Sequence, residues 1–96
     1  MRLSSTPRAN PSVVLRELAD GEAVLVNLDS AAALALNGTS VVVWRLVDGK
    51  RTVQEIPRAV SEHFRDVPES VEDDVLRLLD LFAEGGFIGF EYSATR

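Results

Sequence analysis

The chain has 96 residues, 46% apolar and 26% charged, and contains no cysteine. This length supports one domain with one hydrophobic core, and the lack of cysteine excludes disulfides, thiolate catalysis and cysteine-based zinc sites. Fifteen acidic against ten basic residues give a net charge of −5, which argues against nucleic-acid binding because phosphate neutralisation favours a basic surface.

Neither a membrane span nor a targeting signal is predicted. The longest apolar run, Ala31–Leu36, is far shorter than the roughly 20 residues that cross a bilayer. No apolar stretch follows Arg2, as it would in a signal peptide. We therefore expect a cytoplasmic protein with no membrane partner.

The two ends of the chain lack the periodicity of helices and strands. Residues 1–12 hold two prolines and several small polar residues, which predicts a flexible N-terminal arm. Residues 91–96 are predicted to form a polar C-terminal tail. The folded domain is therefore expected to cover residues 13–90.

Three short strands are predicted after the arm. Residues 13–18 and 23–28 are rich in β-branched and apolar side chains, and the Asp20-Gly21 pair between them is typical of a tight hairpin turn. Residues 31–36 consist of alanine and leucine, which favour helices. However, six residues between two turn signals are few for a helix, so we predict a third strand.

Side chains alternate between the two faces of this third strand. Leu34 and Leu36 share one face, and Ala33 and Ala35 share the other. We expect the two leucines to face the core.

The apolar spacing becomes helical from Thr39, around Trp44, and the Asp48-Gly49 pair ends this first helix. A second helix begins at a capping box in which Thr52 is the N-cap and Glu55 reaches back to it. Its apolar face is predicted to be formed by Val53, Ile56, Val60 and Phe64.

Pro57 is unusual in the second helix, because it lies five positions past the predicted cap. A proline there removes an intrahelical hydrogen bond and costs about 3 kcal/mol if the helix is regular. We therefore expect either a kink or a displaced first turn.

The third helix has the clearest limits. Ser70 is its predicted N-cap, and Gly85-Gly86 ends it. Acidic residues in its first turn suit the helix dipole. Its apolar stripe is predicted to contain Val71, Val75, Leu78 and Phe82, widened by Leu79 and Leu81. The apolar Phe87–Phe90 segment that follows is predicted as a short last strand.

This order of elements predicts an α+β fold. We expect an N-terminal three-stranded antiparallel sheet followed by a three-helix bundle, in a winged-helix-turn-helix-like arrangement. The third strand is expected at an edge of the sheet.

Two parts of the sequence resemble the PqqD family. The first part reads Leu36-Asn37-Gly38-Thr39-Ser40, then Trp44-Arg45-Leu46-Val47-Asp48-Gly49-Lys50-Arg51-Thr52-Val53-Gln54-Glu55-Ile56. The second part reads Val71-Glu72-Asp73-Asp74-Val75, then Leu78, Leu81 and Gly86-Phe87-Ile88. The order and spacing follow the family pattern from about Glu22 to Ile88, which is most of the chain.

The resemblance implies a recognition element for ribosomally synthesised and post-translationally modified precursor peptides. In that family the leader peptide adds as a strand to the edge of the third strand and lies in the groove beside the third helix. The implied partner enzyme is a leader peptidase in lasso-peptide pathways, or a radical SAM enzyme in PqqD-type pathways. No cofactor is implied.

The peptide-binding residues that we predict come from the third strand and the third helix. An edge strand offers unpaired backbone groups, and pockets beside it read alternate side chains of the peptide. We expect a leader side chain to settle between Ala33 or Ala35 and the third helix, and Asp74 to meet a basic or amide group. The full predicted set is Ala31, Ala32, Ala33, Leu34, Ala35, Leu36, Val71, Asp74, Val75, Leu78 and Leu79.

The alternatives to this function are an enzyme, a DNA-binding module and a docking scaffold. An enzyme is not expected, because His63 is the only histidine and no nucleophile–base pair or phosphate-binding loop can be assembled. A winged-helix DNA-binding module would place the acidic third helix in a major groove. A docking scaffold would use exposed aromatic residues, namely Phe87, Phe90 and Tyr92. An unprotected edge strand could also pair with a second copy of the chain as a homodimer.

Overall fold

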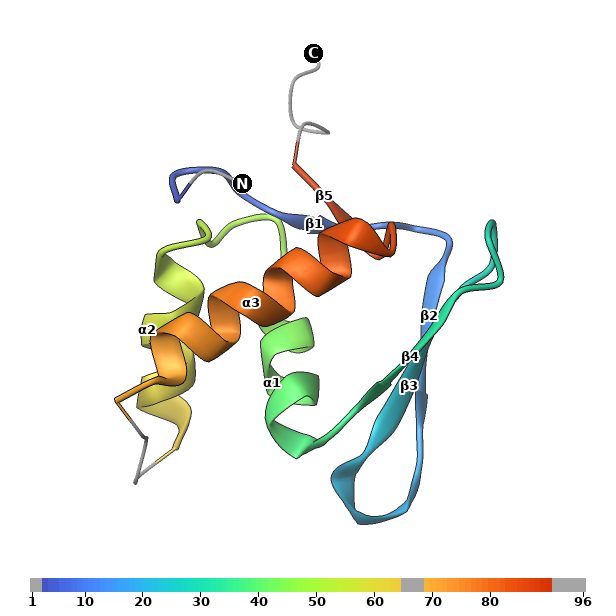
Figure 1. The fold of residues 1–96 in the computed structure, drawn as a ribbon, viewed down its shortest axis with the longest axis horizontal. Coiled ribbons are helices and arrows are strands. Elements are labelled where there is room, and N and C mark those ends of the chain that lie inside the picture. The colour runs from blue at the N-terminus through green and yellow to red at the C-terminus, as the bar shows by residue number, and fades with distance from the viewer. Residues whose placement is uncertain (1–2, 65–68, 91–96) are drawn as a thin grey trace.

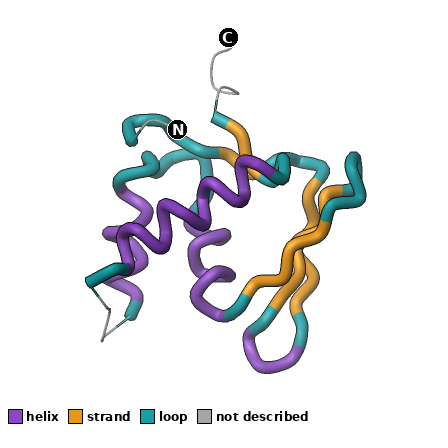
Figure 2. The backbone as a smooth tube through the Cα atoms, viewed as in Figure 1, coloured by secondary structure: helices purple, strands orange, loops and turns teal. Residues whose placement is uncertain are grey.

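The computed structural model describes residues 3–64 and 69–90 of the chain. Within them, three helices lie on one side of a small antiparallel sheet (Figures 1 and 2). In chain order the elements are β1 (Arg8–Ala9), β2 (Val13–Glu17), a 3₁₀ turn (Ala19–Gly21), β3 (Ala23–Asn27), β4 (Ala33–Leu36), α1 (Gly38–Leu46), α2 (Glu55–His63), α3 (Val71–Glu84) and β5 (Ile88–Gly89). The fold is therefore mixed α+β.

The larger sheet contains β2, β3 and β4 in that order, and all neighbours are antiparallel. The turn between β2 and β3 falls at the predicted Asp20-Gly21 pair, where both residues have a positive φ. The strand predicted at residues 31–36 begins only at Ala33. Ala31 belongs to the preceding turn instead, because it has a φ of 65° and its N–H donates to the carbonyl of Asn27 at 2.7 Å.

Residues 3–12, predicted as a flexible arm, are hydrogen-bonded to the domain. The carbonyls of Leu3 and Ser5 accept the N–H groups of Gln54 and Val53 at 3.0 and 2.8 Å. Strand β1 then pairs with β5, and Pro7 between these contacts is buried. Strands β1 and β5 are distant in sequence, so no local pattern in the N-terminal segment predicts their pairing. The predicted tail, residues 91–96, lies outside the described residues.

The core lies between the sheet and the helices. Leu25 and Leu36 cover it from the sheet, and the rings of Trp44 and Phe82 pack in a T-shaped pair with centroids 5.5 Å apart. The other large contributors are Val43, Val53, Ile56, Val60, Val75 and Leu79. These residues confirm most of the apolar stripes predicted for the second and third helices, but Phe64 and Leu81 of those stripes are 37% and 48% exposed. Phe87 also belongs to the core and is only 3% exposed, so the docking surface predicted around it is wrong at this residue.

The predicted starts of the second and third helices each need a correction of detail. Helix α2 begins at Glu55, so Pro57 is its third residue, where an N–H has no intrahelical partner anyway. The displaced first turn is therefore the observed alternative. The Glu55 carboxylate accepts the N–H of Thr52 at 2.8 Å, but the N–H of Glu55 donates to the Thr52 carbonyl rather than to its side chain. Ser70 precedes α3 as predicted, although its hydroxyl donates to Asp74 and caps no backbone N–H.

Candidate functional site

Within the described part of the chain, strand β4 is an edge of the sheet, and its outer side carries unpaired backbone groups. The N–H of Asn27 donates to the carbonyl of Ala32 at 2.8 Å. In an antiparallel pair only alternate residues bond to a given neighbour, so Leu34 and Leu36 are bonded to β3. The N–H and C=O groups of Ala33 and Ala35 therefore point to the free edge.

The side chains of β4 divide in the predicted way, but the alanines do not line the expected space. Leu34 and Leu36 lie opposite Leu25 and Ala23 and face the core. Ala33 and Ala35 are exposed on the outer face, away from the helices. The expectation that a side chain settles between these alanines and α3 is therefore not supported by their orientation. The strand residues on the helix side are Leu34 and Leu36.

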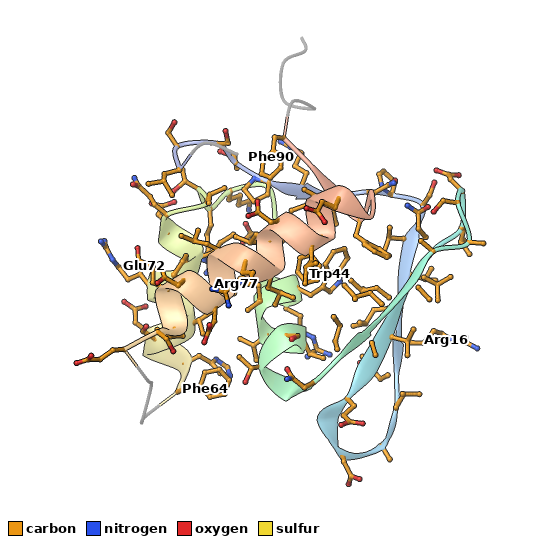
Figure 3. All side chains as sticks on the ribbon, viewed as in Figure 1. Arg16, Trp44, Phe64, Glu72, Arg77 and Phe90 are labelled. Atoms are coloured by element: carbon orange, nitrogen blue, oxygen red, sulfur yellow. The ribbon has the colours of Figure 1, made fainter. Side chains whose placement is uncertain are left out.

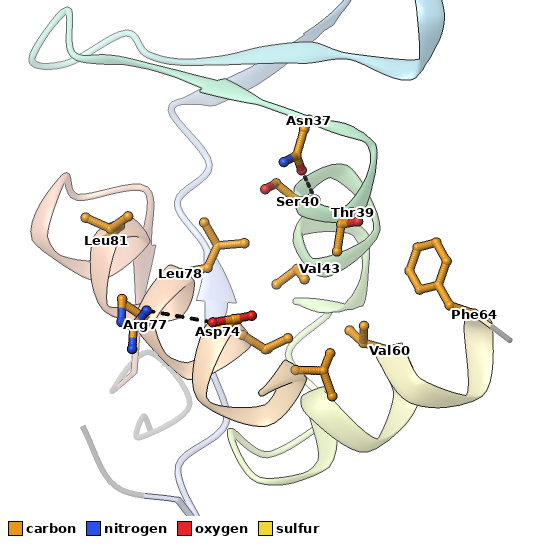
Figure 4. A pocket seen from close by; sticks show the side chains of 12 residues that line it. Asn37, Thr39, Ser40, Val43, Val60, Phe64, Asp74, Arg77, Leu78 and Leu81 are labelled. Carbon is orange, nitrogen blue, oxygen red and sulfur yellow. Dashed lines mark hydrogen bonds and ion pairs between the residues drawn. The ribbon is translucent and has the colours of Figure 1, made fainter. Parts of the chain in front are cut away.

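A pocket of about 490 Å³ opens between α1, α2 and α3, immediately after β4 ends (Figure 4). Its floor is apolar, and its rim carries amide, hydroxyl and charged groups. Asn37 caps α1 at this rim by accepting the N–H of Ser40 at 2.9 Å. The lining residues are Asn37, Thr39, Ser40, Val43, Val60, Phe64, Val71, Asp74, Val75, Arg77, Leu78 and Leu81.

The structure brings together four of the five predicted helix residues. Val71, Asp74, Val75 and Leu78 line the pocket, whereas Leu79 is fully buried in the core. The predicted strand residues, Ala31 to Leu36, do not line it. The end of the strand leads into the pocket, because the lining residue Asn37 directly follows Leu36.

The sequence reasoning missed the walls that α1 and α2 contribute. Thr39, Ser40 and Val43 come from α1, Val60 comes from α2, and Phe64 directly follows α2. In the sequence, the Asn37-Gly38 pair is one of the two turn signals that bound the third predicted strand. The Asn-x-x-Ser spacing that caps α1 was the one signal that could have pointed to this rim.

One charge of each sign stands at the mouth of the pocket. Arg77 and Asp74 are a turn apart on α3, with nitrogen and oxygen 3.7 Å apart, and both are largely exposed (Figure 4). Such an exposed pair contributes little to stability, so both groups stay accessible to a ligand. Their arrangement suits an apolar side chain in the pocket with polar or charged groups next to it.

The described residues contain no cluster of three or more histidine, aspartate or glutamate side chains that could hold a metal ion. No helix among them is long and apolar enough to cross a membrane.

One family of known proteins matches most of this chain. The family model described as coenzyme PQQ synthesis protein D (PqqD) matches residues 22–88. The chain belongs to this family. None of the curated proteins matches it in sequence.

Two solved structures share the fold. One, described as TbiB1 in complex with the TbiA(beta) leader peptide, is 22% identical with a TM-score of 0.69, over 84% of this chain and 93% of that chain. The other, described as lasso peptide synthetase B1 complexed with the leader peptide, is 16% identical with a TM-score of 0.70, over 88% of this chain and 99% of that chain.

Proposed function

We propose that this chain binds the leader of a ribosomally synthesised precursor peptide as a strand added to the free edge of β4. The observation that carries the proposal is the combination of two unpaired alanine positions on that edge with an apolar pocket beside it. Strand addition uses such backbone groups for affinity and such pockets for specificity. Both structures named above hold a leader peptide, which adds support.

An added strand would divide its side chains between two sides of the sheet. Residues directly opposite each other in an antiparallel pair share a face. Leader residues opposite Ala33 and Ala35 would therefore join the outer face. Those opposite Leu34 and Leu36 would project toward the helices, where Val71, Val75 and Leu78 line the pocket.

The domain would present the leader to an enzyme and carry out no chemistry itself. In this proposal the partner is a leader peptidase of a lasso-type pathway or a radical SAM enzyme. A winged-helix role on DNA is disfavoured, because the exposed side of α3 carries one cation, Arg77, against five carboxylates, namely Glu72, Asp73, Asp74, Asp80 and Glu84. Pairing of β4 with a second copy stays a prediction, and it would compete with the leader for the same edge.

The test is a polarisation titration with a fluorescein-labelled leader from a precursor encoded beside this chain. We expect saturable binding at micromolar concentration or tighter, with little dependence on moderate salt. In the variant Leu81→Glu, a carboxylate replaces a pocket side chain that is 48% exposed. Affinity should fall at least tenfold, about 1.4 kcal/mol.

Leu18→Glu is the matched control. Leu18 is 55% exposed and lies next to the β2–β3 turn, outside the pocket. The same substitution should leave leader affinity within about twofold. An equal loss in both variants, or none in either, would refute the assignment of the pocket.

A further inference from the structure

The outer face of the three-stranded sheet is apolar and has no partner in the described part of the chain. Its two central rows are Val14, Val26 and Ala33, and Arg16, Val24 and Ala35. None of these residues belongs to the core, and Val14 is 40% exposed. Figure 3 shows Arg16 pointing away from the helices.

Two further leucines extend this face at its ends. Leu18 and Leu28 are 55% and 66% exposed. An exposed apolar patch with this little charge is typical of an interaction surface. Among the six central residues Arg16 carries the only charge, so a partner surface that fits them is apolar and supplies one carboxylate.

The outer face is continuous with the edge to which a leader would add. The side chains of Ala33 and Ala35 belong to the outer face, and the backbone groups of the same two residues belong to the edge. Given the leader binding proposed above, leader residues opposite these alanines would project onto the same face. The bound leader would become a fourth strand of this surface.

We propose that the outer face, completed by the bound leader, is the docking surface for the enzyme that processes the precursor. The enzyme contacts the valines of β2 and β3 and the outward side chains of the leader at once. It therefore binds the loaded domain more tightly than the empty one. By thermodynamic reciprocity, the enzyme tightens leader binding by the same factor.

The test uses the purified leader-processing enzyme encoded beside the precursor, with the full chain and its leader. Binding of the enzyme is measured with and without saturating leader, and leader affinity is measured separately. Val26→Glu and Arg16→Glu are the informative variants, because they change the outer face and leave the β4 edge and the pocket intact. Leu3→Glu, at a side chain that is 51% exposed on another segment, is the matched control.

We expect the leader to tighten enzyme binding to the unaltered chain by at least tenfold. Each of the two variants should keep leader affinity within about twofold and lose at least tenfold in enzyme binding, while Leu3→Glu changes neither. Retained leader affinity also shows that the variants are folded. This inference would be overturned if both variants bound the enzyme as tightly as the unaltered chain. It would also be overturned if the only effect of the two variants were to convert a dimer of this chain into a monomer. Failure of the unaltered chain to bind the leader would refute the proposed function instead.

Discussion

Replacing Ala35 by proline isolates the contribution of the β4 edge to peptide binding. The N–H of Ala35 points to the free edge, so its removal breaks no hydrogen bond to β3. Proline is tolerated on edge strands when its missing N–H faces outward. We therefore expect the fold to persist, with a loss of stability below about 1 kcal/mol if φ adapts.

The effect on binding follows from the groups that proline removes and adds. A hydrogen bond between the Ala35 N–H and a peptide carbonyl contributes about 0.5–1.5 kcal/mol net. An acceptor that is desolvated without a donor costs about 1–3 kcal/mol, and the proline ring occupies the place of the lost hydrogen. The leader should therefore bind about 10- to 100-fold more weakly, or about 1.4–2.7 kcal/mol.

Two measurements and one control decide the outcome. Polarisation titration with labelled leader gives the affinity, and urea denaturation gives the stability of each variant. Ala35→Thr keeps the N–H and places its larger side chain on the outer face, so it should bind within about twofold of the unaltered chain. Unweakened binding by a folded Ala35→Pro variant would show that the leader does not pair with β4.

Three further predictions concern the scaffold. Asn27→Ala should destabilise the domain by about 1–3 kcal/mol in urea denaturation. The reason is that the buried amide of Asn27 joins the β3–β4 turn to the glycine carbonyls after α3. An unchanged denaturation midpoint would refute this role. Gly86→Ala should cost about 1–2 kcal/mol by the same assay, since Gly86 has a φ of 74° and an added Cβ would lie 3.2 Å from the Asn27 amide nitrogen. Burial raises the pKa of Asp48, but the N–H groups of Lys50 and Arg51 and the Arg51 charge outweigh it and hold that pKa below 3.8. This carboxylate therefore stabilises the fold above about pH 4 and loses its effect as pH falls through its folded pKa, so Asp48→Asn should reduce stability at pH 7 and have less effect at pH 3.

The sequence predicted best those elements whose limits are set by neighbouring residues. The third helix ends where a glycine pair follows an apolar stripe, and α3 runs from Val71 to Glu84 as expected. The hairpin turn at Asp20-Gly21 is equally local. In the third strand, alternation alone placed Leu34 and Leu36 toward the core.

Features made by distant segments could not be predicted in this way. The pairing of β1 with β5 joins residues about 80 positions apart in the chain. The pocket depends on the packing of α1, α2 and α3 against one another, so Thr39 and Val43 gave no signal of their role. Pattern also could not tell that Leu79 is turned into the core while Leu78 is turned into the pocket, because both lie on the apolar side of one helix.

The shortness of β4 has a consequence for the range of substrates. Four residues of strand extend only about 13 Å, so in the proposed binding mode the edge would hold a correspondingly short stretch of peptide. All positions of a precursor outside that bound stretch would be free to vary without loss of affinity for this domain. One such domain would therefore bind the precursors of many different products, provided that each precursor keeps the same short β4-binding stretch in its leader.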